Sequence, residues 1–205
     1  MANATDSFGL RPINLAGGAP NSQGTNAYYI ASDASAIYNG SPVIATNGGT
    51  IAITGSASGD TYKHLGAFNG CEYVSSVTGK KTWSNYWPGS GANTNFDIVG
   101  YVYDNPTQRF VIATDATFTN RATAKAAIFE NTQFNTGTSG STTTGVSSAS
   151  LDVATLDASD ASLPLKILGI YDDPLNQDYA AAGLQMIVMF NNHALLEADS
   201  EGTVA

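Results

Sequence analysis

The sequence predicts an all-β protein, mainly an antiparallel β-barrel or β-sandwich, with an extended N-terminal arm and at most one or two short helices. Short runs in which apolar and polar residues alternate recur along the chain, and this period of two is typical of strands. Clusters of Gly, Asn, Pro and Ser separate the runs and favour turns. At 205 residues the chain can bury an ordinary core. We expect an arm over residues 1–26, a single β-rich domain over 27–196 and a loose acidic tail over 197–205.

The arm is rich in Gly, Asn, Ala and Pro, and its apolar residues are too sparse and irregular for a helix. Such an arm either lies across its own domain or reaches over a neighbour, where a sheet edge can capture it. A disordered terminus is the alternative. If the arm grips a neighbour, the residues that we expect to make the contact are Phe8, Leu10, Arg11 and Ile13.

Residues 37–70 read as strand, turn, strand, loop and strand, with the TNGG sequence of residues 46–49 supplying the first tight reversal. Residues 71–89 continue the pattern, and Thr78-Gly79-Lys80 is a good turn between two strands. Residues 96–103 and 108–114 are both apolar runs, and residues 104–107 between them favour a turn. We expect these two runs to form a hairpin.

The second half contains the one segment that favours a helix, residues 121–131, with Asn120 as a candidate N-cap. A Thr-, Ser- and Gly-rich stretch follows at about 135–150. Its composition is that of a linker, and we expect a long surface loop within one domain. Two strong strand signals, around residues 164–171 and 183–192, complete the predicted domain.

Charge and motifs exclude several classes of function. The chain has eight Lys and Arg against seventeen Asp and Glu, a net charge of −9, so neither a nucleic-acid backbone nor an anionic membrane is an expected partner. The single cysteine, Cys71, is expected to be a small buried residue. No phosphate-binding, dinucleotide, nucleophile-elbow or zinc motif occurs. We expect no catalytic residue, cofactor or metal site, and the N-terminus lacks the pattern of an export signal.

The most aromatic segment contains Trp83, Tyr86 and Trp87. Aromatic residues on paired strands are usually core or subunit-interface residues, and this is the preferred interpretation. A platform on which a sugar ring stacks is the alternative, and it would make the protein a carbohydrate- or receptor-binding β module.

Several short sequences together resemble the head decoration, or capsid cement, proteins of tailed bacteriophages. The most specific are FGLRPI at residues 8–13, YWPG at 86–89, IVGYVYDNP at 98–106 and NNH at 191–193. The order of features is similar over most of the chain. The Thr- and Ser-rich run around residues 139–150 lies outside the pattern, so an inserted loop or an altered lattice contact is expected there.

The resemblance implies a non-enzymatic structural protein that binds the outside of an expanded phage capsid and holds neighbouring subunits of the major capsid protein together. It also implies a homo-oligomer, a dimer or trimer, located on the outer surface of the virion and made in the host bacterial cytoplasm. A neutral polar and aromatic surface suits many weak contacts repeated over a symmetric lattice, since multivalent binding gives an affinity that a single contact does not reach.

Overall fold

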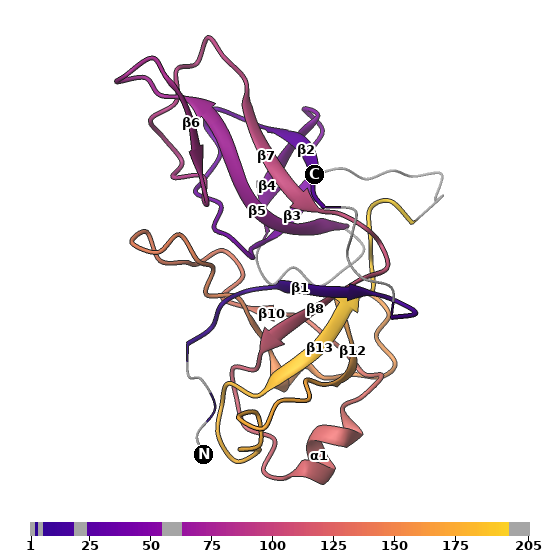
Figure 1. The fold of residues 1–205 in the computed structure, drawn as a ribbon. Coiled ribbons are helices and arrows are strands. Elements are labelled where there is room, and N and C mark those ends of the chain that lie inside the picture. Colours follow the sequence, from indigo (N-terminus) through magenta and orange to yellow (C-terminus); the bar gives the residue numbers. More distant parts are fainter. Residues whose placement is uncertain (1–2, 4–5, 19–23, 55–62, 197–205) are drawn as a thin grey trace.

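The computed structural model describes residues 3, 6–18, 24–54 and 63–196 and confirms the all-β prediction. The described residues form two lobes, one above the other in Figure 1. The strands are β1 (Arg11–Leu15), β2 (Asn26–Ile30), β3 (Pro42–Ala45), β4 (Thr50–Ile53), β5 (His64–Val74), β6 (Lys81–Ser84), β7 (Ile98–Tyr103), β8 (Gln108–Ala113), β9 (Asn131–Thr132), β10 (Phe134–Asn135), β11 (Ser150–Leu151), β12 (Leu165–Ile170) and β13 (Gln185–Phe190). The helical elements are α1 (Arg121–Ala126) and the 3₁₀ turn η1 (Val153–Thr155).

The upper lobe, here called the barrel lobe, is a closed ring of strands. Its sheet has the order β3-β4-β2-β7-β5-β6, and β3 also pairs with β5, which closes five strands into a barrel and leaves β6 outside on β5. Among the described strands of this ring, β2 and β4 are the only pair that runs parallel. The interior is tightly filled, because a Cβ atom at Gly100 would lie 2.9 Å from the side chains of Ile30 and Phe68. Both turns predicted around this ring, at residues 46–49 and 78–80, join antiparallel strands.

The lower lobe, here called the sheet lobe, is an open five-stranded antiparallel sheet with the order β1-β8-β13-β12-β9. One face packs on a core that β10, β11 and α1 help to cover. Alternate residues of β8 and β13 enter this core, among them Phe110, Ile112, Met186, Val188 and Phe190. The helix predicted for residues 121–131 is confirmed over its first part as α1, which ends at Ala126, and Asn131 belongs to β9. Asn120 is the N-cap of α1: its side chain accepts hydrogen bonds from the backbone N–H groups at 122 and 123.

The hairpin predicted for residues 96–114 is wrong, although both of its strands exist. β7 pairs with β2 and β5 in the barrel lobe, whereas β8 pairs with β1 and β13 in the sheet lobe. The connection at residues 104–107 therefore carries the chain from one lobe to the other. Asp104 anchors its start, since this buried carboxylate accepts hydrogen bonds from Asn26 and from the Tyr28 hydroxyl.

The lobes are joined where three distant segments interleave, and we call this arrangement the junction (residues 8–10, 39–41 and 145–149). Backbone hydrogen bonds run from Leu10 N to Gly40 O at 2.8 Å, from Gly9 N to Ala149 O at 3.2 Å and from Ser147 N to Asn39 O at 2.9 Å. The backbones approach so closely that a Cβ at Gly9 would lie 2.5 Å from Gly40 O. The linker-like stretch thus ends in buried structure, although composition alone indicated a surface loop.

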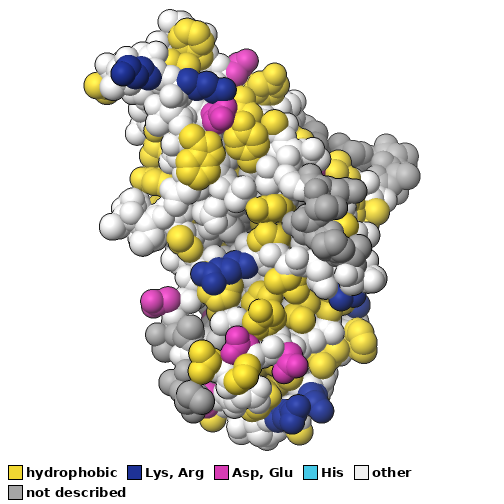
Figure 2. Space-filling view, viewed as in Figure 1, with side chains coloured by type: hydrophobic (Ala, Val, Ile, Leu, Met, Phe, Trp, Pro, Cys, Tyr) yellow, Lys and Arg dark blue, Asp and Glu magenta, His cyan; other side chains and the backbone are white. Residues whose placement is uncertain are grey.

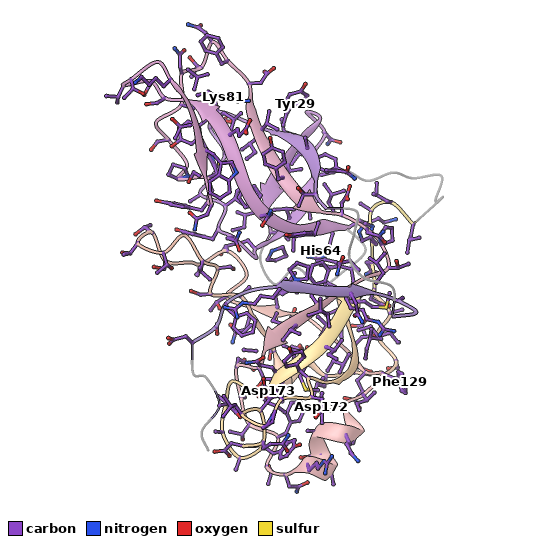
Figure 3. The ribbon with its side chains drawn as sticks, in the orientation of Figure 1. Tyr29, His64, Lys81, Phe129, Asp172 and Asp173 are labelled. Atoms are coloured by element: carbon purple, nitrogen blue, oxygen red, sulfur yellow. The ribbon has the colours of Figure 1, made fainter. Side chains whose placement is uncertain are left out.

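A buried histidine lies between the lobes (Figure 3). His64 begins β5 and stacks on Phe190 of the sheet lobe, with ring centroids 5.4 Å apart. Its backbone pairs with the segment that follows β13, through His64 N to Asn192 O and Ala194 N to His64 O. β5 therefore starts in the core of one lobe and ends in the wall of the other.

Candidate interaction site

The N-terminal segment lies across its own chain, which is one of the two placements expected for the arm. β1 pairs with β8 as an edge strand of the sheet lobe. Strand alternation then separates the predicted contact residues. Leu10 enters the core with 2% of its surface exposed, and so it has no surface left for a neighbour in this conformation. Arg11 and Ile13 lie on the opposite face, and Phe8 is buried at its border beneath the Arg11 guanidinium, 4.0 Å from the ring centroid.

The face of the sheet lobe that carries Arg11 and Ile13 is apolar at its centre, and we call it the docking face. It is the side of the sheet opposite the core. The residues of β8, β12 and β13 that alternate with those of the docking face pack in the core. Val111 of β8 is opposite Ile187 of β13, and Lys166 of β12 is opposite Met189. Ile13, Ile187 and Met189 are each partly exposed. Figure 2 shows hydrophobic side chains gathered over the lower lobe, with a basic side chain among them and acidic side chains below it.

Three of the eight basic residues of the chain, Arg11, Arg109 and Lys166, lie on the docking face. Extending the β8–β13 register by one pair puts Arg109 opposite Met189, so this methionine lies between two cations. Asp172 and Asp173 follow β12 beyond the face (Figure 3). In a chain of net charge −9, the face is thus locally positive.

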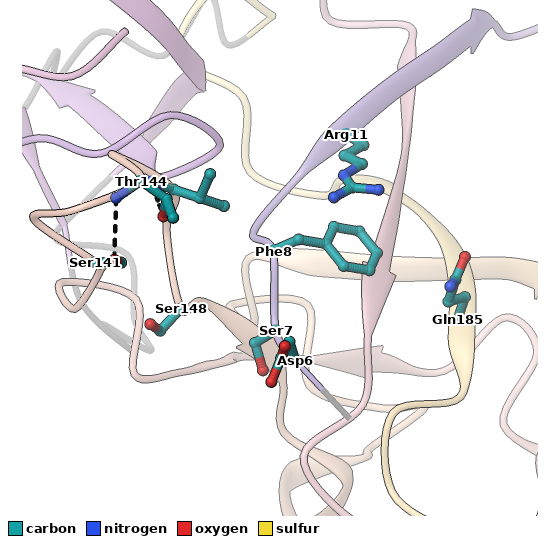
Figure 4. A pocket seen from close by; sticks show the side chains of 9 residues that line it. Asp6, Ser7, Phe8, Arg11, Ser141, Thr144, Ser148 and Gln185 are labelled. Carbon is teal, nitrogen blue, oxygen red and sulfur yellow. Dashed lines mark hydrogen bonds between the residues drawn. The ribbon is translucent and has the colours of Figure 1, made fainter. Parts of the chain in front are cut away.

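A groove of about 630 Å³ opens beside the docking face (Figure 4). The N-terminal segment forms one wall with Phe8 and Arg11, and the Thr- and Ser-rich stretch forms another with Ser141 and Thr144. The remaining lining residues are Asp6, Ser7, Val146, Ser148 and Gln185. The groove therefore offers hydroxyl groups, one amide, one carboxylate and one guanidinium around two apolar side chains. Its size lies within the range of binding pockets in proteins.

The Thr- and Ser-rich wall is held by the barrel lobe. Tyr86 donates a hydrogen bond from its hydroxyl to Thr142 O, and Asn85 Nδ2 donates to Thr144 O at 2.7 Å. The Tyr86 ring stacks on Tyr38 with centroids 5.7 Å apart, and a Cβ at Gly140 would lie 2.2 Å from the Tyr38 ring. The stretch that the resemblance left unexplained is thus fixed in place beside the N-terminal segment.

The predicted aromatic trio does not form one surface. Trp87 is completely buried in the barrel core, where its indole N–H donates to Ala34 O at 3.1 Å. Tyr86 supports the groove wall, and only Trp83 is exposed, with 60% of its surface open. Trp87 is accordingly a core residue, while a sugar platform made of all three rings is wrong. The chain bends at residues 85–86, after β6 ends at Ser84, so Trp83 stays on the outside of the barrel wall and Trp87 enters its core.

The histidine and cysteine side chains lie away from the groove. His64 and His193 are both buried between the lobes, and burial raises the pKa of the Cys71 thiol in the barrel core to about 12. Among the described residues, no group of three His, Cys, Asp or Glu side chains is placed to hold a metal ion. Within the same residues, no helix has the length and apolar character needed to cross a membrane.

Comparison with known proteins adds no relative: no family model, no curated protein and no solved structure matches the chain.

Proposed function

We propose that the protein is a capsid decoration protein that binds the outside of a tailed-phage shell and cements neighbouring subunits of the major capsid protein. The observation that carries the proposal is the docking face: a partly exposed apolar sheet face, built in part by the N-terminal strand and bordered by a hydroxyl-lined groove. Apolar surface rimmed by polar groups is typical of protein-binding sites. The sequence resemblance supports the same function independently.

The charge on the docking face indicates the kind of shell surface that it meets. Arg11, Arg109 and Lys166 surround the apolar side chains of Ile187 and Met189. A complementary partner surface carries carboxylates around an apolar centre, and such complementarity guides both encounter and orientation. The groove beside the face accepts a protruding neutral polar loop, since four hydroxyl side chains line it and the charges of Asp6 and Arg11 offset each other.

Because the shell repeats the same surface, individually weak contacts are sufficient for tight binding. A symmetric shell presents the same surface many times, and a dimer or trimer of the protein engages several copies at once. We propose that the protein binds as such a homo-oligomer, on the virion exterior. Sedimentation equilibrium of the purified chain measures this directly, and a monomeric mass at all concentrations would contradict it.

Deleting the N-terminal segment is a poor test, because Leu10 belongs to the core and β1 covers an edge of β8. Met189→Glu is sharper. The new carboxylate lies between Arg109 and Lys166, where it can pair with these cations without breaking the sheet. It removes the apolar centre and offsets part of the local positive charge. Val77→Glu is the matched control, because Val77 is 89% exposed at the tip of the β5–β6 hairpin on the other lobe.

The assay is co-sedimentation with expanded, DNA-free shells of the phage whose genome encodes the chain. Unmodified protein is expected to bind saturably, at a fixed ratio to shell subunits, and to raise the temperature at which the shell breaks. Met189→Glu is expected to bind at least about tenfold more weakly, and Val77→Glu to bind normally. Equal binding by both variants would remove the docking face from the proposal, and no saturable binding by the unmodified chain would overturn the function.

A further inference from the structure

Trp83 is an exposed aromatic ring that its own strands hold in place. It lies on β6 with 60% of its surface open to solvent. The ring rests against Gly70 of the neighbouring strand β5: a Cβ added at Gly70 would lie 3.1 Å from Trp83 Cζ2. Packing over a strand glycine fixes the orientation of the ring, so little side-chain entropy remains to be lost when a ligand binds.

A second ring lies on the other side of β5. Tyr101 of β7 is the register partner of Gly70, and its position alternates with the barrel-facing residues 100 and 102, so that it points outward. β6 and β7 both pair with β5, and Tyr101 is offset from the row of Trp83, Glu72 and Val99 by two residues along the strands. Two strand spacings and this offset put the backbones at Trp83 and Tyr101 about 12 Å apart. The two rings therefore flank one strand on the outer surface of the barrel.

An ion pair lies between and beside the rings. Glu72 is the register partner of Trp83, and its carboxylate receives a hydrogen bond from Lys81 Nζ at 2.5 Å. The Lys81 hydrogen bond and, to a smaller extent, one from the Tyr101 hydroxyl lower the pKa of the Glu72 carboxyl. In Figure 2 the upper lobe likewise shows an acidic and a basic side chain side by side, next to hydrophobic ones. The surface thus presents hydrogen-bond acceptors and donors close to two rings, with no net charge.

We propose that this surface, the aromatic face (Trp83, Tyr101, Glu72 and Lys81), is a binding site for a neutral oligosaccharide. A sugar ring has one face of C–H groups, which packs on an aromatic ring, and a rim of hydroxyls, which both donate and accept hydrogen bonds. Two rings with a carboxylate between them and an ammonium beside them complement both features. The cancelled charge of the Glu72–Lys81 pair complements an uncharged chain of sugars.

Other ligands that stack on aromatic rings fit this face less well. Single-stranded nucleic acid uses aromatic rings inside a basic groove, whereas the one ammonium here is already paired with a carboxylate in a chain of net charge −9. The site lies on the barrel lobe and the docking face on the sheet lobe, so the inference does not rest on capsid binding. A copy fixed to a shell through the sheet lobe would carry a sugar-binding surface in addition.

The two tryptophans of the chain make the site easy to observe. Trp87 is buried in the barrel core, where its indole N–H donates a hydrogen bond to Ala34 O, whereas Trp83 is exposed. A ligand on the aromatic face changes the emission of Trp83 and its quenching by acrylamide, while Trp87 serves as an internal reference. Four uncharged hexasaccharides, of β-linked glucose, β-linked N-acetylglucosamine, β-linked mannose and α-linked glucose, are titrated into the full chain up to about 10 mM, a range that covers weak binding.

At least one hexasaccharide is expected to shift the emission to the blue saturably and to protect Trp83 from acrylamide. Calorimetry with that sugar should show binding lost in Trp83→Ala, at least about fivefold weaker in Tyr101→Ala and unchanged in Val77→Ser, an exposed residue of the same hairpin. The inference is overturned if none of the four sugars gives a saturable change, or if binding persists in Trp83→Ala. It is also overturned if Trp83→Ala abolishes shell binding, because the face would then belong to a protein contact.

Discussion

Acid should destabilise the protein through His64, the buried histidine between the lobes. Its imidazole stacks on Phe190 and lies 5.5 Å from the Phe134 ring, and neither ring nitrogen has a hydrogen-bond partner among the described residues. Burial lowers the pKa of His64 to about 3, with a smaller contribution from the nearby His193. In the unfolded chain the pKa of a histidine is about 6.5.

The direction of this pH effect depends on whether the folded or the unfolded state binds the proton more tightly. Between pH 6.5 and pH 3 the unfolded chain binds the proton and the folded protein does not. The free energy of unfolding is therefore unaffected by His64 above about pH 6.5 and decreases as the pH falls below it. The difference of 3.5 pKa units, from 6.5 to 3, corresponds to about 5 kcal/mol in full. At pH 5 the loss from this residue is about 2 kcal/mol, a large part of the stability of an ordinary domain. Burial also lowers the pKa of His193, which adds a loss of the same sign.

The measurement is urea unfolding at pH 7.5 and at pH 5, followed by far-ultraviolet circular dichroism. His64→Phe replaces an imidazole without hydrogen bonds by a ring that suits its aromatic neighbours, and His64→Leu serves if the larger ring does not fit. The unmodified protein should lose about 2 kcal/mol more than the variant between the two pH values. An equal loss in both proteins would refute the assignment to His64.

Three further predictions concern single positions. Gly9→Ala should cost about 3 kcal/mol or more, measured by urea unfolding, because φ is +71° and the new methyl group would lie 2.5 Å from Gly40 O; Gly17→Ala, where φ is +88° with nothing within 4 Å, separates the strain from the clash. Asn120→Ala should cost about 1 kcal/mol, since it removes the acceptor for two N–H groups of α1, and a cost near zero would show that the cap is replaceable. Cys71 should resist a thiol reagent at pH 8 in the folded protein and react at once in urea, because burial raises the pKa of its thiol to about 12; rapid reaction without denaturant would contradict its place in the barrel core.

The sequence was most informative where local pattern determines structure. Period-two runs, the Gly79 turn and the Asn120 cap predicted the strands, the β5–β6 hairpin and α1, because each depends on neighbouring residues alone. The hairpin proposed for residues 96–114 failed because a short turn between two strands does not reveal whether they pair. Here the buried Asp104 carboxylate fixes residues 104–107 as a crossing between lobes, a contact that only the folded chain contains.

The candidate sites were only partly predictable for the same reason. The sequence identified residues 8–13 and the Thr- and Ser-rich stretch, but gave no signal that they would line one groove, since more than a hundred residues separate them. On the aromatic face it identified Trp83 but not Tyr101 or Glu72, which join it only through strand register. Three of the four motifs that carry the resemblance, FGLRPI, IVGYVYDNP and NNH, lie in or next to the segments that connect the two lobes.

The chain order of the strands has a consequence for how the protein folds. All six strands of the barrel lobe lie between β1 and β8, within residues 26–103, so this lobe can assemble from one continuous stretch. The central pairing of the sheet lobe joins β8 to β13, whose strands begin 77 residues apart, from Gln108 to Gln185. Pairing over such separations is slow, since the entropy cost of closing a long loop comes before the stabilising contacts form. The barrel is thus expected to form while the ribosome is still synthesising the second half, and to hold the N-terminal strand near its place until β13 emerges.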